Sequence, residues 1–391
     1  MGLRKLSSGV FMLSALDYDR RLFDSLIPLP DGTTYNSYLI TGSEKTALID
    51  TVDPKFSAFL LGSLPEKLDY IVSNHAEQDH SGAIPLLLEK FPDAKIICTE
   101  LAKPMLISLL HIDEGRFVTV KDNEQLSLGD KTLTFISLPW SHWPETMATY
   151  LNEDKILFSC DLFGSHLATT RIYADGAVYE PAKRYYAEIM MPFAKFIKAH
   201  LSKLRNFDIK LIAPSHGQIY NNPDFIFNAY DDWLGNPKNS VVVLYVSMHG
   251  SVKKMVDALV DSLASNGINV RQFNLAKSDI GKIAIALVDA LTIVVATPTV
   301  RNMPHPNVIY ALSIANIIVP KAKYLAVLNS YGWSNTTTIA AIKNSVPNLN
   351  IDLLGIVGCK GQPTEKELGA VKDLAEEINK KHTAVFSDKA N

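Results

Sequence analysis

The second half of the chain alternates short apolar runs with amphipathic segments. The runs are rich in β-branched residues and predict five buried strands, at residues 241–246, 269–273, 291–296, 324–328 and 351–357. Helical periodicity is found at 252–264, 307–317, 336–344 and 364–380. Strands that alternate with helices indicate a parallel sheet with helices on both of its faces. We therefore expect a doubly wound α/β domain with a five-stranded parallel sheet.

The first half has a mixed pattern with more strands than helices. Apolar runs predict strands at residues 38–40, 46–50, 70–73, 95–98, 131–137, 156–159 and 210–213. Helices are predicted at 83–90, 103–110 and 185–205. The Gly235-Asn236-Pro237 cluster is a turn signal, and a new apolar strand begins soon after it. We expect two domains, at residues 1–237 and 238–391.

The composition is that of an ordinary globular protein with two cores. The 391 residues exceed the usual size of one domain, and 38 basic residues nearly balance 41 acidic ones. A formal net charge of -3 gives no electrostatic reason to expect binding to nucleic acid or to an anionic membrane. The first residues lack a signal-peptide pattern, and no apolar stretch is long enough to span a bilayer. We expect a cytoplasmic protein without a nucleic-acid or membrane partner.

The three cysteines are too few and too dispersed to form a cofactor site of their own. Cys98, Cys160 and Cys359 include no CxxC pair, and such a sparse, odd set is typical of reduced thiols. A rubredoxin-type or iron–sulfur module within these residues is not expected, because it needs four closely grouped thiolates.

The most informative stretch follows the apolar run at 70–73. Four ligand-type side chains lie within six positions there, namely His75, Glu77, Asp79 and His80. In locally extended backbone, residues two apart point to the same side, so several of these groups are expected to converge. Three further candidates stand at strand ends or in loops, namely His142, Asp161 and His216. Any one of the seven is explained as well by a turn or a helix cap, but the ordered set predicts a metal site.

Three loops in the second half lie at the carboxyl ends of predicted strands, where doubly wound sheets bind ligands. The first offers hydroxyls, a glycine and backbone N–H groups at a helix N-terminus, which suit a phosphate. The candidate residues are Ser247, Met248, His249, Gly250, Ser251 and Val252, then Thr297, Pro298, Thr299, Val300, Arg301 and Asn302, then Ser330, Tyr331, Gly332 and Trp333. Each loop alone is also explained as an ordinary strand-to-helix turn.

The order of the seven ligand types resembles the metallo-β-lactamase fold, whose signature runs HxHxDH and continues with a His, an Asp and a His. Glu77 stands where the hydrolases carry their second His. An oxygen ligand in place of an imidazole favours iron over zinc. The resulting HxExDH pattern resembles the flavodiiron family, which implies an N-terminal αββα metallo-β-lactamase-like sandwich and a C-terminal flavodoxin-like domain.

The resemblance also assigns roles to the candidate residues. It implies that His75, Glu77 and His142 hold one iron, that Asp79, His80 and His216 hold the other, and that Asp161 bridges them. The three loops resemble the family's FMN site, close to S-M-Y-G-N-T, S-P-T-x-N-N and S-Y-G-W. This chain departs from that pattern at His249, Val252 and Arg301. Valine offers no hydroxyl to the phosphate, so weaker FMN binding is expected.

The function implied by this resemblance is reduction of dioxygen to water, of nitric oxide to nitrous oxide, or of both. The cofactors are two iron ions and one FMN. Electrons are expected from a rubredoxin-like protein or from reduced coenzyme F420. The family resemblance also implies a head-to-tail homodimer, with a tetramer as an alternative, in which the FMN of one subunit serves the irons of the other.

Side chains around the ligands are expected to orient the imidazoles. His166, Tyr185 and Tyr186 are the candidates, and His166 and Tyr186 are the ones we assign to catalysis. The alternative is that His166 is a loop residue and that both tyrosines pack a helix. The remaining histidines are expected mostly in surface or loop positions, namely His111, His200, His249, His305 and His382.

Two rival functions remain open at this point. One is a metallo-β-lactamase-type hydrolase with an appended flavodoxin domain, against which Glu77 argues. The other is an electron carrier whose first domain has lost its metal, against which the complete ligand set argues. Metal analysis of the purified protein separates both from the flavodiiron assignment.

Overall fold

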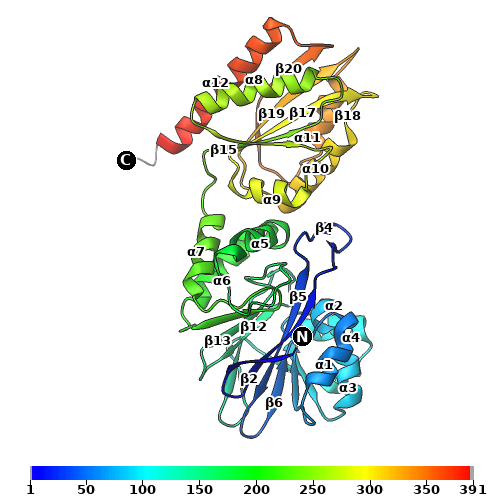
Figure 1. The fold of residues 1–391 in the computed structure, drawn as a ribbon, viewed down its shortest axis with the longest axis vertical. Helices are drawn as coiled ribbons and strands as arrows, with labels where there is room; N and C mark the ends of the chain where they lie inside the picture. The colour runs from blue at the N-terminus through cyan, green and yellow to red at the C-terminus, as the bar shows by residue number, and fades with distance from the viewer. Residues whose placement is uncertain (1, 388–391) are drawn as a thin grey trace. The chain divides into compact units, whose positions relative to one another are not determined.

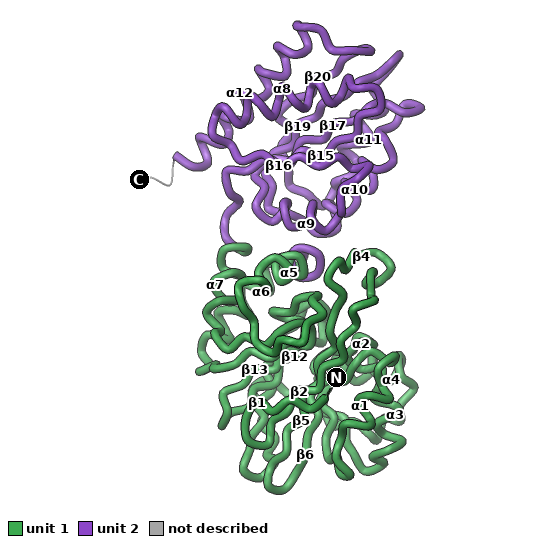
Figure 2. Tube along the Cα trace, viewed as in Figure 1, with its two compact units in different colours: residues 1–186, 193–234 green, residues 187–192, 235–391 purple. Residues whose placement is uncertain are grey.

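A computed structural model describes residues 2–387 and divides into two compact units. Unit 1 comprises residues 1–186 and 193–234, and unit 2 comprises residues 187–192 and 235–391 (Figure 2). Each unit has a hydrophobic core of its own. Within residues 2–387, no helix combines the length and the apolar composition needed to cross a bilayer.

Unit 1 is built on two sheets. The larger contains, in spatial order, β1 (Leu3–Ser7), β2 (Val10–Asp17), β5 (Thr33–Thr41), β6 (Thr46–Ile49), β7 (Tyr70–Val72), β8 (Lys95–Thr99) and β9 (Phe117–Val120). The smaller contains β10 (Gln125–Ser127), β11 (Thr132–Ser137), β12 (Met147–Leu151), β13 (Ile156–Cys160) and β14 (Leu211–Pro214). A separate hairpin is formed by β3 (Leu22–Phe23) and β4 (Ile27–Pro28).

The strands of unit 1 separate two cores because alternate side chains point to opposite faces. Met12 packs between the sheets with Phe135 and Phe158, whereas its neighbour Leu13 faces the core that the outer helices share. These helices are α1 (Ser57–Ser63), α3 (Ile84–Lys90) and α4 (Ala102–Leu110), with the short α2 (Gln78–Ser81) nearby. On the other side lie α5 (Tyr179–Tyr185), α6 (Ala194–Leu204) and α7 (Pro223–Leu234) (Figure 1). The αββα sandwich is confirmed.

Unit 2 is a single twisted sheet with helices on both faces. Five parallel strands follow the order β16 (Asn269–Asn274), β15 (Ser240–Tyr245), β17 (Thr292–Val300), β19 (Tyr324–Tyr331) and β20 (Asp352–Lys360). The short β18 (Met303–Pro304) pairs with β17. Figure 1 shows α8 (Ser251–Ser265) and α12 (Glu365–Ser387) on one face, and α9 (Ile280–Asp289), α10 (Pro306–Ile318) and α11 (Thr336–Asn344) toward the other. This 2-1-3-4-5 order confirms the flavodoxin-like prediction.

One predicted helix is wrong. The segment 185–205 is not continuous: α5 ends at Tyr185, a π-helical turn spans Tyr186–Met190, a 3-10 turn spans Met191–Phe193, and α6 then begins. Pro192 has no N–H to donate to the preceding turn, so a regular helix cannot run through it. Several elements were not predicted, including β1, β2, β9, β10, β12, α1, α7 and α9.

Two histidines expected at the surface are buried. His200 is 7% exposed, and its Nε2 lies 2.8 Å from the carbonyl oxygen of Pro139. His382 is 1% exposed and lies between the Thr292 hydroxyl and the Asn239 side chain, at 2.7 Å from each. The prediction failed because an amphipathic helix leaves room for a polar residue on its inner face when that residue finds hydrogen-bond partners.

Candidate metal centre and cofactor cleft

All seven predicted ligands converge in unit 1. They come from four places in the chain that meet at one edge of the sandwich: the segment from the end of β7 into α2, the β11–β12 loop, the end of β13 and the end of β14. The backbone is extended at Glu77, as expected, but Asp79 and His80 lie on the short α2. Five of the seven are at most 7% exposed, namely His75, Asp79, His80, Asp161 and His216.

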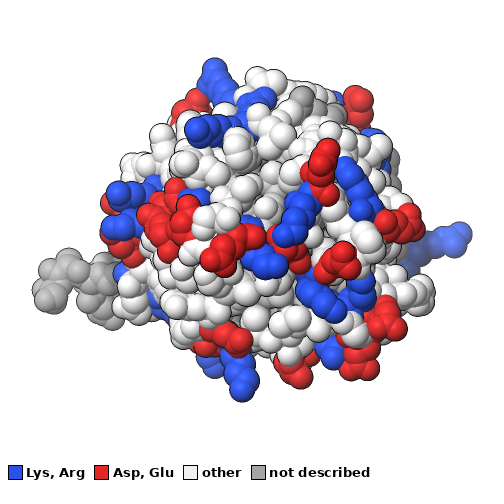
Figure 3. All heavy atoms as spheres, turned by 90° about the horizontal axis from the view of Figure 1, so that it is seen from below, with Lys and Arg blue, Asp and Glu red and all other residues white. Residues whose placement is uncertain are grey.

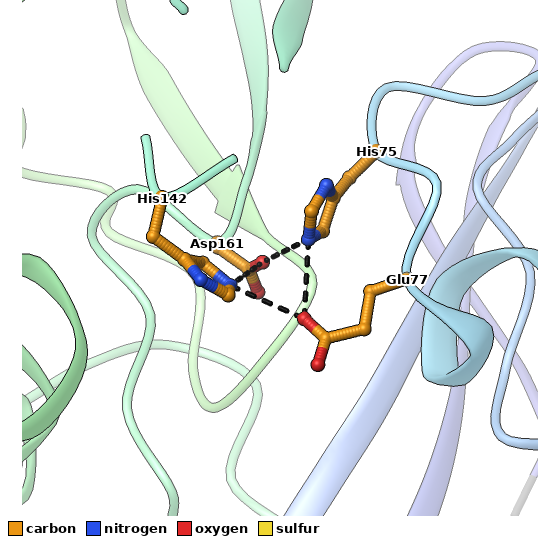
Figure 4. Close-up of side chains that lie close together, drawn as sticks. All are labelled: His75, Glu77, His142 and Asp161. Atoms are coloured by element: carbon orange, nitrogen blue, oxygen red, sulfur yellow. Dashed lines mark hydrogen bonds and ion pairs between the residues drawn. The ribbon is translucent and has the colours of Figure 1, made fainter. Parts of the chain in front are cut away.

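The first group contains His75, Glu77, His142 and Asp161 (Figure 4). Oε2 of Glu77 lies 3.1 Å from Nε2 of His75 and 3.2 Å from Nε2 of His142. Oδ2 of Asp161 lies 3.5 and 3.3 Å from the same two nitrogens. Four donor atoms therefore face one another, two of them nitrogens and two of them oxygens.

The second group contains Asp79, His80 and His216, again with Asp161. Oδ1 of Asp161 lies 3.1 Å from Nε2 of His80 and 3.4 Å from Nε2 of His216. Asp79 places Oδ1 at 3.3 Å from His80 and Oδ2 at 3.2 Å from His216. Asp161 therefore turns one oxygen toward each group, the arrangement that a bridging carboxylate requires.

The convergent atoms lack the partners that buried polar groups normally have. No hydrogen bond is made by either oxygen of Asp79, either ring nitrogen of His80 or Oδ2 of Asp161. Leaving such groups buried without hydrogen bonds is costly, and two cations placed between them would satisfy the set. The mixture of imidazole and carboxylate donors suits iron.

Electrostatics at the centre favour cations. Burial alone would raise the pKa of Asp161, but His80 and His142 outweigh it and hold that pKa well below its ordinary value. Burial would likewise lower the pKa of His80, yet Asp79 and Asp161 raise it to about 10. Without metal, protons therefore occupy nitrogens that a metal ion would use.

Cys160 lies beside the second group, although its sequence position gave no sign of this. Its sulfur lies within 4.8 Å of donor atoms of His80 and Asp161. Burial and the nearby carboxylates of Asp50 and Asp161 raise the pKa of its thiol well above the ordinary value. The group therefore remains a protonated thiol at neutral pH.

Three further contacts fix the ligands from outside. Glu145 and Thr34 accept hydrogen bonds from imidazoles: Nδ1 of His75 lies 2.8 Å from Oε1 of Glu145, and Nδ1 of His216 lies 2.7 Å from the carbonyl oxygen of Thr34. Tyr185 donates its hydroxyl to Oδ1 of Asp161 at 2.8 Å. Such outer partners set the orientation of an imidazole and direct its other nitrogen to the metal. Glu145 was missed, although it follows His142 by only three positions.

The three candidates around the ligands have different surroundings. The ring of His166 lies 5.0 Å from that of His216 and 4.8 Å from that of Tyr185. Its Nδ1 faces the Thr33 hydroxyl at 2.9 Å, and its buried Nε2 has no hydrogen-bond partner. Tyr186 instead packs its ring against Tyr230 and Trp233. The structure therefore brings His166 and Tyr185 to the centre, and it places Tyr186 in an aromatic cluster.

An open cavity of about 450 Å³ leads to the ligands. Phe23 and Trp143 contribute apolar surface, Arg20 contributes a cation paired with Asp53 at 3.0 Å, and Glu77 and Asp79 lie in its wall. A small molecule can therefore reach both ligand groups from solvent.

A second cavity, of about 200 Å³, lies in unit 2 at the carboxyl ends of the strands. Its walls include ten of the predicted residues, namely Ser247, Met248, His249, Ser251, Val252, Pro298, Thr299, Ser330, Tyr331 and Gly332. Gly361, after β20, was missed, although two of the three predicted loops contain a glycine after a strand. Gly250 adopts a positive φ of 87° directly before α8, which glycine allows without strain.

Six predicted residues do not line this cavity. They are Gly250, Thr297, Val300, Arg301, Asn302 and Trp333. Thr297 is buried and accepts the N–H of His305 at 3.0 Å. Trp333 is 73% exposed and donates its indole N–H to Asn302 at 2.9 Å.

Several known proteins are similar to this chain in sequence and in fold. A model of the ODP family beta lactamase matches residues 33–217. A nitric oxide reductase of Moorella thermoacetica is 38% identical over 343 residues, which cover 84% of this chain and 86% of that protein. The rubredoxin oxygen:oxidoreductase of Desulfovibrio gigas has a TM-score of 0.92 at 30% identity, covering 98% of this chain and 99% of the other. The flavodiiron protein of Giardia intestinalis has a TM-score of 0.91 at 30% identity, covering 98% and 97%.

These similarities extend over nearly the whole chain rather than over one motif. They combine with the two ligand groups in unit 1 and the cleft in unit 2. The chain therefore belongs to the flavodiiron protein family.

Proposed function

We propose that this protein is an oxidoreductase that reduces dioxygen to water, nitric oxide to nitrous oxide, or both, with electrons passed through FMN. The observation that carries the proposal is Asp161, whose two oxygens face two separate groups of ligand-type side chains. A site built around a shared carboxylate suits a pair of metal ions rather than one. Glu77 in the first group favours iron, and thereby reductase over hydrolase chemistry.

In this proposal, each ligand group holds one iron. His75, Glu77 and His142 hold the first, Asp79, His80 and His216 hold the second, and Asp161 serves both. When bound, two ferrous ions and a reduced flavin together supply the electrons that convert dioxygen fully to water.

The surrounding residues orient the ligands and keep protons in place. Burial and the charge of Asp161 raise the pKa of Tyr185 well above its ordinary value, so Tyr185 keeps its hydroxyl proton and donates a hydrogen bond to Asp161. Burial and the neighbouring His216 lower the pKa of His166, so this imidazole is neutral. Its unpartnered Nε2 is available to a molecule that binds beside His216.

The cleft of unit 2 is the proposed FMN site. Its phosphate would lie at the N-terminus of α8, where Ser247 already accepts the N–H of Lys253 at 3.2 Å. The proposed electron donor is a rubredoxin-like protein or reduced coenzyme F420. We further propose domains at residues 1–237 and 238–391, a cytoplasmic location and a head-to-tail homodimer, with a tetramer as the alternative.

The face drawn in Figure 3 carries acidic and basic side chains side by side. It has no broad area of one sign, which is the feature that would steer a highly charged partner.

Replacing Asp161 by alanine tests the proposed function. Loss of the shared carboxylate should lower the iron content and abolish consumption of both gases, while FMN remains bound in the other unit. The measurements are iron and flavin content, and anaerobic gas consumption with chemically reduced rubredoxin. Asp93→Ala, which removes an exposed carboxylate, is the control. Unchanged iron content in the Asp161 variant would remove that residue from the site, and zinc in the wild type would favour a hydrolase.

A further inference from the structure

The two ligand groups offer a metal ion the same kinds of donor atom. Each contains two imidazoles that present Nε2, one carboxylate of its own and one oxygen of Asp161. With matching donor atoms, the contacts that these ligands make outward tune how tightly each position binds a metal.

The first group has an anionic outer partner. Glu145 is 1% exposed, and its Oε1 accepts hydrogen bonds from Nδ1 of His75 at 2.8 Å and from the backbone N–H of Ala76 at 2.9 Å. Its own backbone carbonyl accepts the Thr99 hydroxyl at 2.9 Å, which holds the loop in place. An imidazole that donates its N–H to a carboxylate becomes a stronger donor at its other nitrogen.

The second group has only a neutral outer partner. Nδ1 of His216 is bonded to the backbone carbonyl of Thr34 at 2.7 Å, and Nδ1 of His80 has no hydrogen-bond partner. Asp50 is the buried carboxylate whose pKa responds to His80, but its oxygens accept bonds from Asn74 and Ser215 rather than from an imidazole. The imidazoles of this group therefore have no anionic hydrogen-bond partner that would make them stronger donors, as Glu145 does for His75.

The two oxygens of Asp161 also differ in donor strength, and the stronger donor again faces the first group. Oδ1, which faces the second group, accepts the hydroxyl proton of Tyr185 at 2.8 Å. Oδ2, which faces the first group, accepts no hydrogen bond. A hydrogen bond withdraws electron density from the oxygen that accepts it, so Oδ2 is the stronger donor to a metal.

We propose that Glu145 and Tyr185 are positioning residues that make the two metal positions unequal, so that the position held by His75, Glu77 and His142 binds its metal first and more tightly. The proposal rests on the proposed di-iron function of the site. Glu145 strengthens the first position through His75, and Tyr185 weakens the second through Asp161.

Stepwise titration of the metal-free protein with cobalt(II), followed by absorbance under anaerobic conditions, tests the order of binding. The wild type should bind two equivalents in two resolved steps. The tighter step should be lost in His142→Ala and kept in His216→Ala. A single step with equal affinities, or the reverse assignment, would overturn the proposal. Failure of the wild type to bind two equivalents would instead count against the proposed function.

Two substitutions with opposite expected effects test the residues. Glu145→Gln keeps an oxygen for both N–H groups but removes the charge, so the tighter step should weaken by roughly 10- to 100-fold. Tyr185→Phe removes the bond to Oδ1, so the weaker step should tighten by on the order of tenfold. Glu124→Gln makes the same chemical change at a carboxylate that accepts the N–H of Lys121 and should alter neither step. Unchanged steps in the first two variants would contradict the assigned roles.

A second readout separates these roles from general loss of structure. In iron-loaded Glu145→Gln with normal flavin content, the midpoint potential of the first iron should move to a more positive value, because a weaker donor stabilises the ferric ion less. An unchanged potential would argue against an electronic role. If Glu145→Gln fails to fold, nitrogen-15 NMR of the zinc-loaded wild type decides. The Nδ1 proton of His75 should exchange slowly with solvent, and rapid exchange would overturn the hydrogen bond to Glu145.

Discussion

At the scale of single residues, protons and metal ions compete for the same nitrogens. Burial lowers the pKa of His75, but hydrogen bonds to Glu145 and Glu77 raise it well above its ordinary value. Burial also lowers the pKa of His142, but the nearby carboxylates of Asp161 and Glu77 outweigh it and raise that pKa above its ordinary value. The pKa of His80 rises to about 10. In the metal-free protein the protonated His80 stabilises the fold fully below pH 6.5, and that stabilisation is lost as the pH rises through about 10.

Metal uptake near pH 7 should therefore release protons. Because a metal ligand must be deprotonated, we expect more than one proton to leave as the two positions fill, and the apparent metal affinity to rise with pH. Calorimetric titration in buffers of different ionisation enthalpy counts the protons. Asp93→Ala should release as many as the wild type, and His80→Gln fewer. Uptake without proton release would show that these pKa values are not raised.

The departure at Val252 has a measurable consequence for FMN. Val252 lines the cleft of unit 2 and is 1% exposed at the start of α8, next to the expected phosphate position. Val252→Thr adds a hydroxyl of similar size there, and one added hydrogen bond should tighten FMN binding by on the order of tenfold. Quenching of flavin fluorescence measures the dissociation constant. Val256→Thr, one turn further along α8 and fully buried, should destabilise the protein without tightening FMN.

At the scale of secondary-structure elements, the sequence was most informative where the pattern of apolar residues is regular. The helix at residues 336–344 and the strands of unit 2 were predicted within a few residues, because β-branched runs and amphipathic periods are local signals. β12 was missed because only one of its five residues, Thr149, is β-branched, so it gives a weak strand signal. The break around Pro192 was not predicted, because the apolar periodicity on both sides of it is typical of one continuous helix.

The same limit applies to the site. The types and order of the seven ligands were readable because each follows an apolar strand or opens a loop. The role of Glu145 could not be predicted, because its partner His75 lies 70 positions earlier and only the fold shows that their loops meet. Tyr185 and Tyr186 are neighbours in sequence, and the irregular backbone after Tyr185 determines which of them reaches Asp161.

The helix α12 contains a buried histidine that makes unit 2 sensitive to acid. Burial lowers the pKa of His382 to about 4 from an ordinary 6.5. Above pH 6.5 the imidazole is neutral in both states, whereas between pH 6.5 and 4 only the unfolded chain gains the proton, so stability falls as the pH drops through this window.

Substitution of His382 tests this directly. His382→Gln removes the titrating group, so the variant should lose less free energy of unfolding between pH 6.5 and 4 than the wild type does. Urea unfolding followed by circular dichroism at several pH values provides the comparison. His111→Asn is the control, because His111 is exposed at φ 54°, a conformation that asparagine tolerates. Equal pH profiles for the wild type and His382→Gln would contradict the role of His382.

At the scale of the whole molecule, the two proposed cofactor sites belong to separate compact units. The ligand groups lie in unit 1 and the cleft lies in unit 2, so electrons must pass from one unit to the other. In the proposed head-to-tail homodimer, the unit 2 of one subunit serves the unit 1 of its partner. Electron transfer between subunits and electron transfer within one chain therefore predict different activities for mixed dimers.

Two inactive variants should restore activity when combined in one dimer. Asp161→Ala removes the metal site, and Ser247→Asp keeps an oxygen for the Lys253 N–H while placing a negative charge at the expected FMN phosphate. In a mixed dimer, the flavin of the first variant would face the intact metal site of the second. Equal co-expression should give half mixed dimers with one working pair each, or about a quarter of wild-type activity. If electrons passed within one chain, every such dimer would be inactive, since no single chain would carry both cofactors.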